Sequence, residues 1–310
     1  MKVGVVGTGF VGSSAAYAIV LRGIASEVAL VDVNTALANA HAEDILHAVP
    51  FGTPVRITAG GFPVLDGASA VILACGVGQK PGETRLQLLA RNAELLWSVI
   101  PQVLAHAPNA ILVVASNPVD IITQTVTHIS NLPPERVVGS GTILDTARFR
   151  ALLGDHLDIA PQSVHAYVLG EHGDSEVMIW SSAKAAGVPI ETFAAQTGHS
   201  MSPETKAQIE EKVRHAAYRI IAGKKATYFG IGAGLATIIK AIRDNEQVIL
   251  TLSSLNTTLP KFERACFSLP RVLGAKGIVT TIEPTLDPHE SAAFHRSIAI
   301  LCEAAKDLRI

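Results

Sequence analysis

The stretch at residues 3–12, Val-Gly-Val-Val-Gly-Thr-Gly-Phe-Val-Gly, decides the fold class of this chain. Residues 3–6 form a short apolar run typical of a buried strand, and Gly7, Gly9 and Gly12 follow with the spacing G-x-G-x-x-G where a helix begins. Glycines at these places permit a tight turn and let the N–H groups of a helix N-terminus approach a phosphate. The stretch therefore predicts a dinucleotide site, with Val11 among its contacts.

Asp32 supports the same site because it stands twenty residues after Gly12, at the end of a second predicted strand at 28–31. A carboxylate at this place bonds the ribose hydroxyls and repels a 2′-phosphate, which favours NAD over NADP. The alternative is that the glycines only mark a turn and that Asp32 caps the next helix.

Short apolar runs alternate with helical stretches up to about residue 141. This rhythm predicts a doubly wound parallel sheet of the Rossmann type, with strands at 3–6, 28–31, 70–74, 111–115 and 137–139 that are buried on both faces. Beyond it we expect longer helices at 203–222, 227–242 and 288–308, and strands near 248–252 and 265–272. The expected domains are a dinucleotide-binding domain at 1–141 and a mixed α+β substrate domain at 142–310.

Composition excludes several classes of partner. The net charge of the 310 residues is -2, which gives no basic field for nucleic acid. No apolar run reaches the length of about 18 residues that a membrane-spanning helix needs. Cys75, Cys266 and Cys302 lie far apart and lack any paired spacing, so we expect no metal, no disulfide and a cytoplasmic location.

Four segments carry residues suited to chemistry, and the first two follow predicted strands directly. They are 76–85 (GVGQKPGETR), 116–118 (SNP), 145–148 (DTAR) and 170–175 (GEHGDS). The carboxyl ends of the strands line the ligand crevice of a doubly wound sheet. Gln79, Arg85 and Asn117 should therefore face the cofactor.

In this order and along the whole chain, these segments resemble the L-2-hydroxyacid dehydrogenase family, and within it the bacterial lactate dehydrogenases. The resemblance implies hydride transfer between NAD and C2 of a 2-oxo acid, with His172 exchanging the accompanying proton. Asp145 should hold the imidazole and raise its pKa. Arg148, one helical turn later, should bind the substrate carboxylate with its planar fork.

The resemblance assigns further contacts. Arg85 should polarise the reacting carbonyl from the end of a closing loop, Asn117 should donate to the same oxygen, and Thr227 should line the pocket beside the substrate side chain. Further expected cofactor contacts are Gly76, Val77, Ser116, Asn117 and Ser140. Taken singly, Asp145 and Arg148 could be a plain helical ion pair, Arg85 a solvated charge and Asn117 part of a turn. We interpret Cys75 as a small buried residue and not as a nucleophile.

Gln79 is the residue most informative about the substrate. Family members that act on malate carry arginine at this loop position, and those that act on lactate carry glutamine. A neutral Gln79 would not offset the burial of a second carboxylate, whereas pyruvate brings only a methyl group. We therefore expect the conversion of pyruvate to L-lactate, the last step of fermentative glycolysis. The alternatives are a malate or broader 2-hydroxyacid dehydrogenase, or a dinucleotide sensor without turnover.

Arg150 and His165 match positions that bind fructose 1,6-bisphosphate across a subunit interface in allosteric bacterial relatives. The resemblance thus implies a homotetramer activated by this effector, whose phosphates would neutralise repulsion between the two cations. The alternative is that both are ordinary surface charges.

Overall fold

A nine-stranded sheet forms the centre of the fold in a computed structural model that describes residues 1–77, 82 and 85–306. The strand order is β12-β11-β10-β6-β5-β4-β1-β2-β3. Six neighbouring strands are parallel: β1 (Lys2–Val6), β2 (Glu27–Val31), β3 (Arg56–Ala59), β4 (Ala70–Leu73), β5 (Ile111–Val114) and β6 (Val137–Gly139). The order of these six confirms the doubly wound prediction, and the chain reverses direction across the sheet between β1 and β4.

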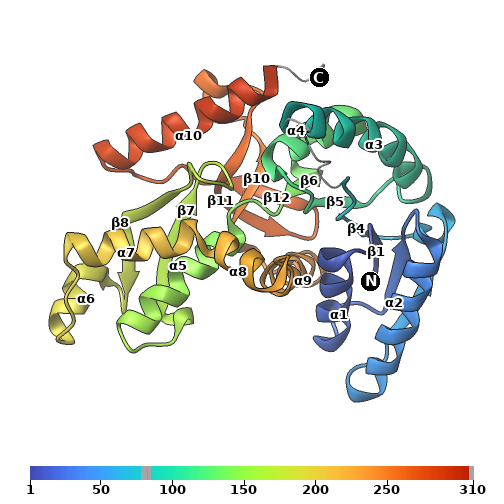
Figure 1. Cartoon of the computed structure of the whole chain (residues 1–310), viewed down its shortest axis with the longest axis horizontal. Coiled ribbons are helices and arrows are strands. Elements are labelled where there is room, and N and C mark those ends of the chain that lie inside the picture. Colours follow the sequence, from blue (N-terminus) through green and yellow to red (C-terminus); the bar gives the residue numbers. More distant parts are fainter. Residues whose placement is uncertain (78–81, 83–84, 307–310) are drawn as a thin grey trace.

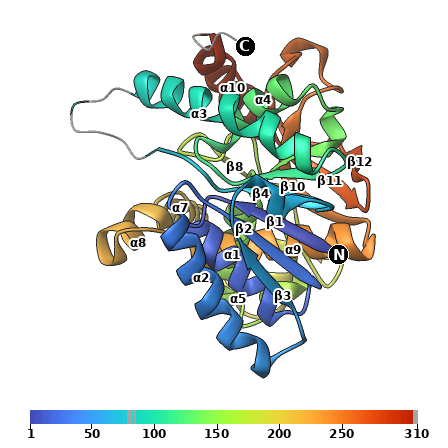
Figure 2. The same cartoon turned by 90° about the vertical axis from the view of Figure 1, so that its right-hand side faces the viewer.

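Helices cover both faces of the parallel strands (Figures 1 and 2). One face carries α3 (Arg85–His106) and α4 (Val119–Ser130), and the other carries α1 (Phe10–Leu21), α2 (Thr35–Ala48) and α9 (Phe229–Asp244). The alternation of side chains along the strands divides the core around the large sheet into two clusters, one on each face.

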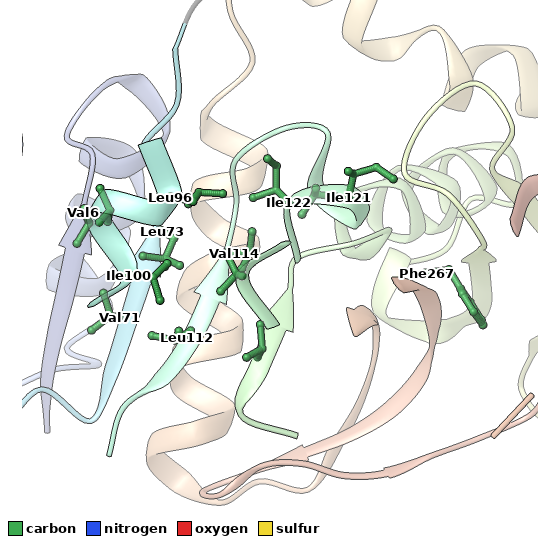
Figure 3. Close-up of a cluster of buried hydrophobic side chains, with 14 of the residues drawn as sticks. Val6, Val71, Leu73, Leu96, Ile100, Leu112, Val114, Ile121, Ile122 and Phe267 are labelled. Carbon is green, nitrogen blue, oxygen red and sulfur yellow. The ribbon is translucent and has the colours of Figure 1, made fainter. Parts of the chain in front are cut away.

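Strand β4 shows this division. Val71 and Leu73 pack with Leu96 and Ile100 of α3, as Figure 3 shows, while Ile72 belongs to the cluster on the opposite face. All four residues of β4 are buried, and β5 is buried in the same way. The prediction that these strands are covered on both faces is confirmed.

The C-terminal half of the chain contributes to two sheets. Strands β10 (Val248–Leu255), β11 (Cys266–Gly274) and β12 (Gly277–Thr281) run antiparallel and extend the large sheet beyond β6. A separate antiparallel sheet contains β7 (Val164–Leu169), β8 (Val177–Ala185) and β9 (Val188–Pro189). The remaining helices are α5 (Ile143–His156), α6 (Ile190–Gln196), α7 (Pro203–Arg214), α8 (Ala216–Lys224) and α10 (Pro288–Lys306).

Several features differ from the prediction. The helix expected at 203–222 is two helices, because the backbone at His215 leaves helical geometry with φ -93° and ψ 7°. The helix expected from residue 227 begins at Phe229. Strand β3 was not predicted, since it lies at the sheet edge and lacks an apolar run.

Short 3-10 helices occupy Val49–Phe51, Phe62–Leu65, Pro134–Arg136, Pro161–Ser163 and Pro260–Phe262. Within the described ranges no helix combines the length and apolarity needed to cross a membrane.

Candidate active site

The glycine turn between β1 and α1 has the geometry of a phosphate cradle. Gly7 has φ +92°, and a Cβ there would lie 2.5 Å from the backbone nitrogen of Cys75. A Cβ on Gly12 would lie 1.9 Å from the carbonyl oxygen of Gly7, so the helix can approach the strand only without one. Gly9 faces open space and no side chain caps α1. The first N–H groups of α1 are therefore placed to bind a phosphate.

Asp32 lies directly after β2 and is bonded to the same turn. Its Oδ2 accepts a hydrogen bond from the backbone N–H of Thr8 at 2.6 Å, and its Oδ1 accepts from Asn34 N–H at 2.9 Å. The cap of α2 is Asn34, whose side chain accepts from Leu37 N–H at 3.1 Å. The alternative interpretation of Asp32 as the helix cap is therefore wrong. The cradle and this carboxylate together fit the pyrophosphate and ribose of a dinucleotide.

The turns after β4, β5 and β6 meet at the same edge of the sheet. The Ser116 hydroxyl donates to the carbonyl oxygen of Cys75 at 2.5 Å, and Ser140 N–H donates to Val114 O at 2.8 Å. Asn117 is exposed between β5 and α4. Burial raises the pKa of the Cys75 thiol to about 11, which is opposite to what a nucleophile needs.

The helix α3 fixes one of these turns. The side-chain oxygen of Asn92 accepts a hydrogen bond from Val77 N–H at 3.0 Å, and Gly76, next to it, is exposed. Val11 is half-buried in the first turn of α1. Gly76, Val77, Ser116, Asn117 and Ser140 thus follow the carboxyl ends of neighbouring strands, and Val11 lies in the helix after β1.

His172 and Asp145 form a closely bonded pair. Nδ1 of His172 lies 2.6 Å from Oδ2 of Asp145, whose side chain is 2% exposed, while the imidazole is 26% exposed. Nη1 of Arg148 donates to Oδ1 of Asp145 at 2.8 Å. The helical ion pair between Asp145 and Arg148 is present, and its carboxylate also contacts His172.

Three long-range contacts hold the loop that carries His172. Gly170 pairs with Ser268 of β11 through two backbone hydrogen bonds of 3.0 and 2.9 Å, and Glu171 N–H donates to the Ser297 hydroxyl of α10 at 2.9 Å. His172 N–H donates to Oδ2 of Asp120 at 2.8 Å. Because Asp120 lies in the first turn of α4, the imidazole is held close to the Asn117 turn and hence to the dinucleotide edge.

In the His172–Asp145 pair, the charge of each partner shifts the pKa of the other in the direction opposite to the effect of burial. Burial alone would lower the pKa of His172, but the charge of Asp145 and its hydrogen bond, with the charge of Asp120, raise this pKa to about 9. Burial alone would raise the pKa of Asp145, but His172 and Arg148 hold it below its usual value. The resting pair is therefore an imidazolium beside a carboxylate at neutral pH, ready to give up a proton.

Sequence analysis missed two acidic residues near this pair. Asp120 is 2% exposed, and burial raises its pKa to about 6 against the hydrogen bonds that lower it. The sequence feature that could have identified Asp120 is an acidic residue in the first turn of the helix that follows the 116–118 segment. Glu176 is 3% exposed and directly follows the 170–175 segment.

The structure describes only part of the expected substrate-binding residues. Gln79 lies outside the described residues, and Arg85 is the first residue of α3, with its side chain outside the description. Thr227 is half-buried two residues before α9. Three residues further on, a Cβ on Gly230 would lie 2.8 Å from Leu144, so the start of α9 packs against the helix that carries Asp145.

Arg150 and His165 lie on adjacent elements, α5 and β7. Nε of Arg150 donates to the carbonyl oxygen of Ala166 at 2.9 Å, and its guanidinium lies 5.0 Å from the centre of the Tyr167 ring. His165 is exposed. Arg150 thus contacts the two residues that follow His165 in β7.

A dinucleotide cradle at one end of the sheet and a histidine–carboxylate pair beside it define a class: oxidoreductases that couple hydride transfer on a nicotinamide to proton transfer on a substrate. Comparison with known proteins identifies the family. Residues 1–139 match the lactate/malate dehydrogenase NAD-binding domain, and residues 142–308 match the lactate/malate dehydrogenase alpha/beta C-terminal domain. The chain belongs to the lactate/malate dehydrogenase family, and NAD is its cofactor.

Similar proteins match over nearly the full chain. An L-lactate dehydrogenase of Thermus aquaticus is 57% identical over 99% of both chains, and one of Allorhizobium ampelinum is 55% identical over 98% of both. The solved structure of a minor L-lactate dehydrogenase from Enterococcus mundtii superposes with a TM-score of 0.94 at 41% identity, covering 100% of this chain and 98% of that one. The resemblance seen in the sequence is confirmed at the level of the family.

Proposed function

We propose that the protein is an NAD-dependent L-lactate dehydrogenase that interconverts pyruvate and NADH with (S)-lactate and NAD+. The observation that carries the proposal is the 2.6 Å contact between Nδ1 of His172 and Oδ2 of Asp145, held beside the dinucleotide edge of the sheet. Relatives named L-lactate dehydrogenase support this choice within the family.

The acid–base pair handles the proton of the reaction. Bound NADH supplies a hydride to C2 of the substrate. Because Nδ1 of His172 faces Asp145, Nε2 is the ring nitrogen left to donate a proton to the keto oxygen. Asp145 stays ionised and stabilises the imidazolium before transfer. In the reverse direction the neutral Nε2 accepts the hydroxyl proton of lactate.

Arg148 binds the carboxylate of the substrate in this proposal. Its contact with Asp145 fixes the plane of the guanidinium, so that the fork can meet a carboxylate with two hydrogen bonds. Arg85 and Asn117 polarise the keto oxygen, Thr227 lines the pocket, and Gln79 faces the methyl group of pyruvate. The proposed cofactor contacts are Gly7, Gly9, Val11, Gly12, Asp32, Gly76, Val77, Ser116, Asn117 and Ser140.

Substrate choice is tested by following NADH absorbance with pyruvate, oxaloacetate and a bulkier 2-oxo acid at equal concentrations. We expect the highest kcat/KM with pyruvate. A clear preference for oxaloacetate would replace the proposal by a malate dehydrogenase, and equal turnover of the bulkier acid by a broader 2-hydroxyacid dehydrogenase. No turnover with any of the three would leave a dinucleotide sensor.

We also propose that fructose 1,6-bisphosphate activates the enzyme through Arg150 and His165. Two observations support the proposal: His165 is exposed, and Arg150 is held against the neighbouring residues of β7 through the carbonyl oxygen of Ala166. The bisphosphate should lower the apparent KM for pyruvate, and Arg150→Gln and His165→Gln should each remove the response. An unchanged KM in the wild type would end the proposal.

A homotetramer is proposed from the family, and exposed aromatic residues support an interface. Phe10 of α1 is 65% exposed and Phe229 of α9 is 70% exposed, and both helices lie side by side (Figure 1). Light scattering that shows a monomer at working concentration would refute it. We also propose that the chain divides into two domains between residues 141 and 142. The proposed enzyme acts in the cytoplasm, in fermentative glycolysis.

A further inference from the structure

Glu176 is a buried carboxyl group behind the acid–base pair that the proposed reaction does not use. It lies one residue before β8 and is 3% exposed. Within the described part of the chain its Oε1 has no hydrogen-bond partner. A carboxylate oxygen of Glu176, one of Asp145 and a ring nitrogen of His172 all lie within 4.8 Å of one another. The group is therefore close enough to affect proton transfer.

The nearby cations are engaged elsewhere. Arg148 is paired with Asp145, and Arg214 of α7 is paired with Glu210 at 3.4 Å. Nη2 of Arg214 donates to the backbone oxygen of Glu176 at 3.0 Å. An ionised Glu176 would thus add a second buried anion beside Asp145, which both desolvation and repulsion oppose.

We propose that Glu176 is a positioning residue that keeps its proton in the resting enzyme, so that its charge is not added to those of Asp145 and Asp120 beside His172. The inference rests on the proposed function, because it concerns the proton that His172 exchanges with the substrate. Burial and then the charge of Asp145 raise the pKa of Glu176 to about 9, although His172, Arg214 and Arg148 lower it.

A protonated Glu176 keeps the proton affinity of His172 within a useful range. A third anion would stabilise the imidazolium further, and the ring would then release its proton to the keto oxygen less readily. At alkaline pH the two groups titrate together, since the charge of an ionised Glu176 raises the pKa of His172.

A cavity of about 570 Å³ borders Glu176 and is lined by residues of β8, α7 and α10. It is large enough for water, which gives the carboxyl a route for proton exchange. Its remaining charged lining residues balance in sign, with three basic side chains (Lys206, Arg214 and Arg296) and three acidic ones (Glu210, Asp287 and Glu290), and His289 also lines it. The cavity therefore provides no net positive field that would ionise Glu176.

Infrared spectroscopy of the resting protein tests the protonation directly. At pH 7 we expect the wild type to show the C=O band of a protonated carboxyl that is missing in Glu176→Gln and retained in Glu211→Gln. Glu211 is a matched control because it is exposed on α7 and undergoes the same change of charge. If Glu176→Gln loses no such band, the proposal is overturned whatever the substrate is. Should that variant not fold, the band in the wild type must disappear as the pH rises through about 9.

The pH profile of pyruvate reduction tests the link to His172. In Glu176→Gln the alkaline limb of kcat/KM should move to lower pH by about 1 pH unit, because the later ionisation of Glu176 no longer supports the imidazolium. Glu211→Gln should leave the limb in place. A uniform loss of activity at all pH values in Glu176→Gln would show a purely structural role and overturn the proposal. Wild-type turnover of pyruvate tests the proposed function separately.

Discussion

The backbone N–H of His172 donates a 2.8 Å hydrogen bond to the carboxylate of Asp120, 52 residues earlier in the chain. Asp120 belongs to the first turn of α4, directly beyond the Asn117 turn that ends β5. The bond thus connects the loop of the acid–base pair to the edge of the sheet that carries the glycine turn. Because Asp120 is buried, water does not compete for this contact.

Asp120→Ala should lower kcat for pyruvate by about 10-fold or more. The substitution leaves the His172 N–H without its acceptor, at a cost of about 1–3 kcal/mol, and frees the imidazole to move away from the cofactor edge. Steady-state kinetics would show the loss in kcat with little change in the KM for NADH. Asp120→Asn is the matched control, since its side-chain oxygen can still accept the bond. Equal losses in both variants would contradict a positioning role.

Asp145→Asn should move the alkaline limit of pyruvate reduction to lower pH. The charge of Asp145 holds the pKa of His172 near 9, so the wild-type ring keeps its proton up to that pH. Without this anion burial dominates and the pKa falls, by about 1–3 pH units for an opposite charge at this distance. The pH profile of kcat/KM would show the limb shifted downward. An unshifted limb would mean that another group donates the proton.

Asp32→Ser should increase the use of NADPH relative to NADH. The Asp32 carboxylate lies beside the glycine turn, where it would repel a 2′-phosphate. Serine removes the charge and retains a hydroxyl that can accept from Thr8 N–H. The ratio of kcat/KM for the two cofactors measures the change, and Asp44→Ser on α2 is a control with the same loss of charge. A constant ratio would show that Asp32 only supports the turn.

Much of the fold could be predicted because its elements are locally encoded. The strands from β1 to β6, other than β3, are apolar runs, and the glycine turn specifies its own φ angles. The break at His215 has no such signal, since neither proline nor glycine marks it. Likewise, no local pattern indicates that β10 pairs with β6, because that pairing depends on how the two halves pack.

Sequence analysis also named the residues of the acid–base pair but not those that hold them. Asp145, Arg148 and His172 stand in recognisable segments. Asp120 lies 52 residues before His172, and only the tertiary structure brings the two together. Glu176 directly follows the 170–175 segment, but its burial beside Asp145 is visible only in the structure. Buried carboxyl groups without a motif are therefore the part of the site that a single sequence does not reveal.

Gln79→Arg should shift specificity from pyruvate toward oxaloacetate. In the proposed site the loop position of Gln79 faces the substituent on C2 of the substrate, so a guanidinium there should pair with the second carboxylate of oxaloacetate. Compensating a buried charge in this way is worth several kcal/mol, so we expect the kcat/KM ratio of oxaloacetate to pyruvate to rise by about 100-fold or more. Gln79→Glu is the control of opposite charge and should reject oxaloacetate more strongly than the wild type does. If both variants change the ratio in the same direction, residue 79 acts through loop conformation and not through charge.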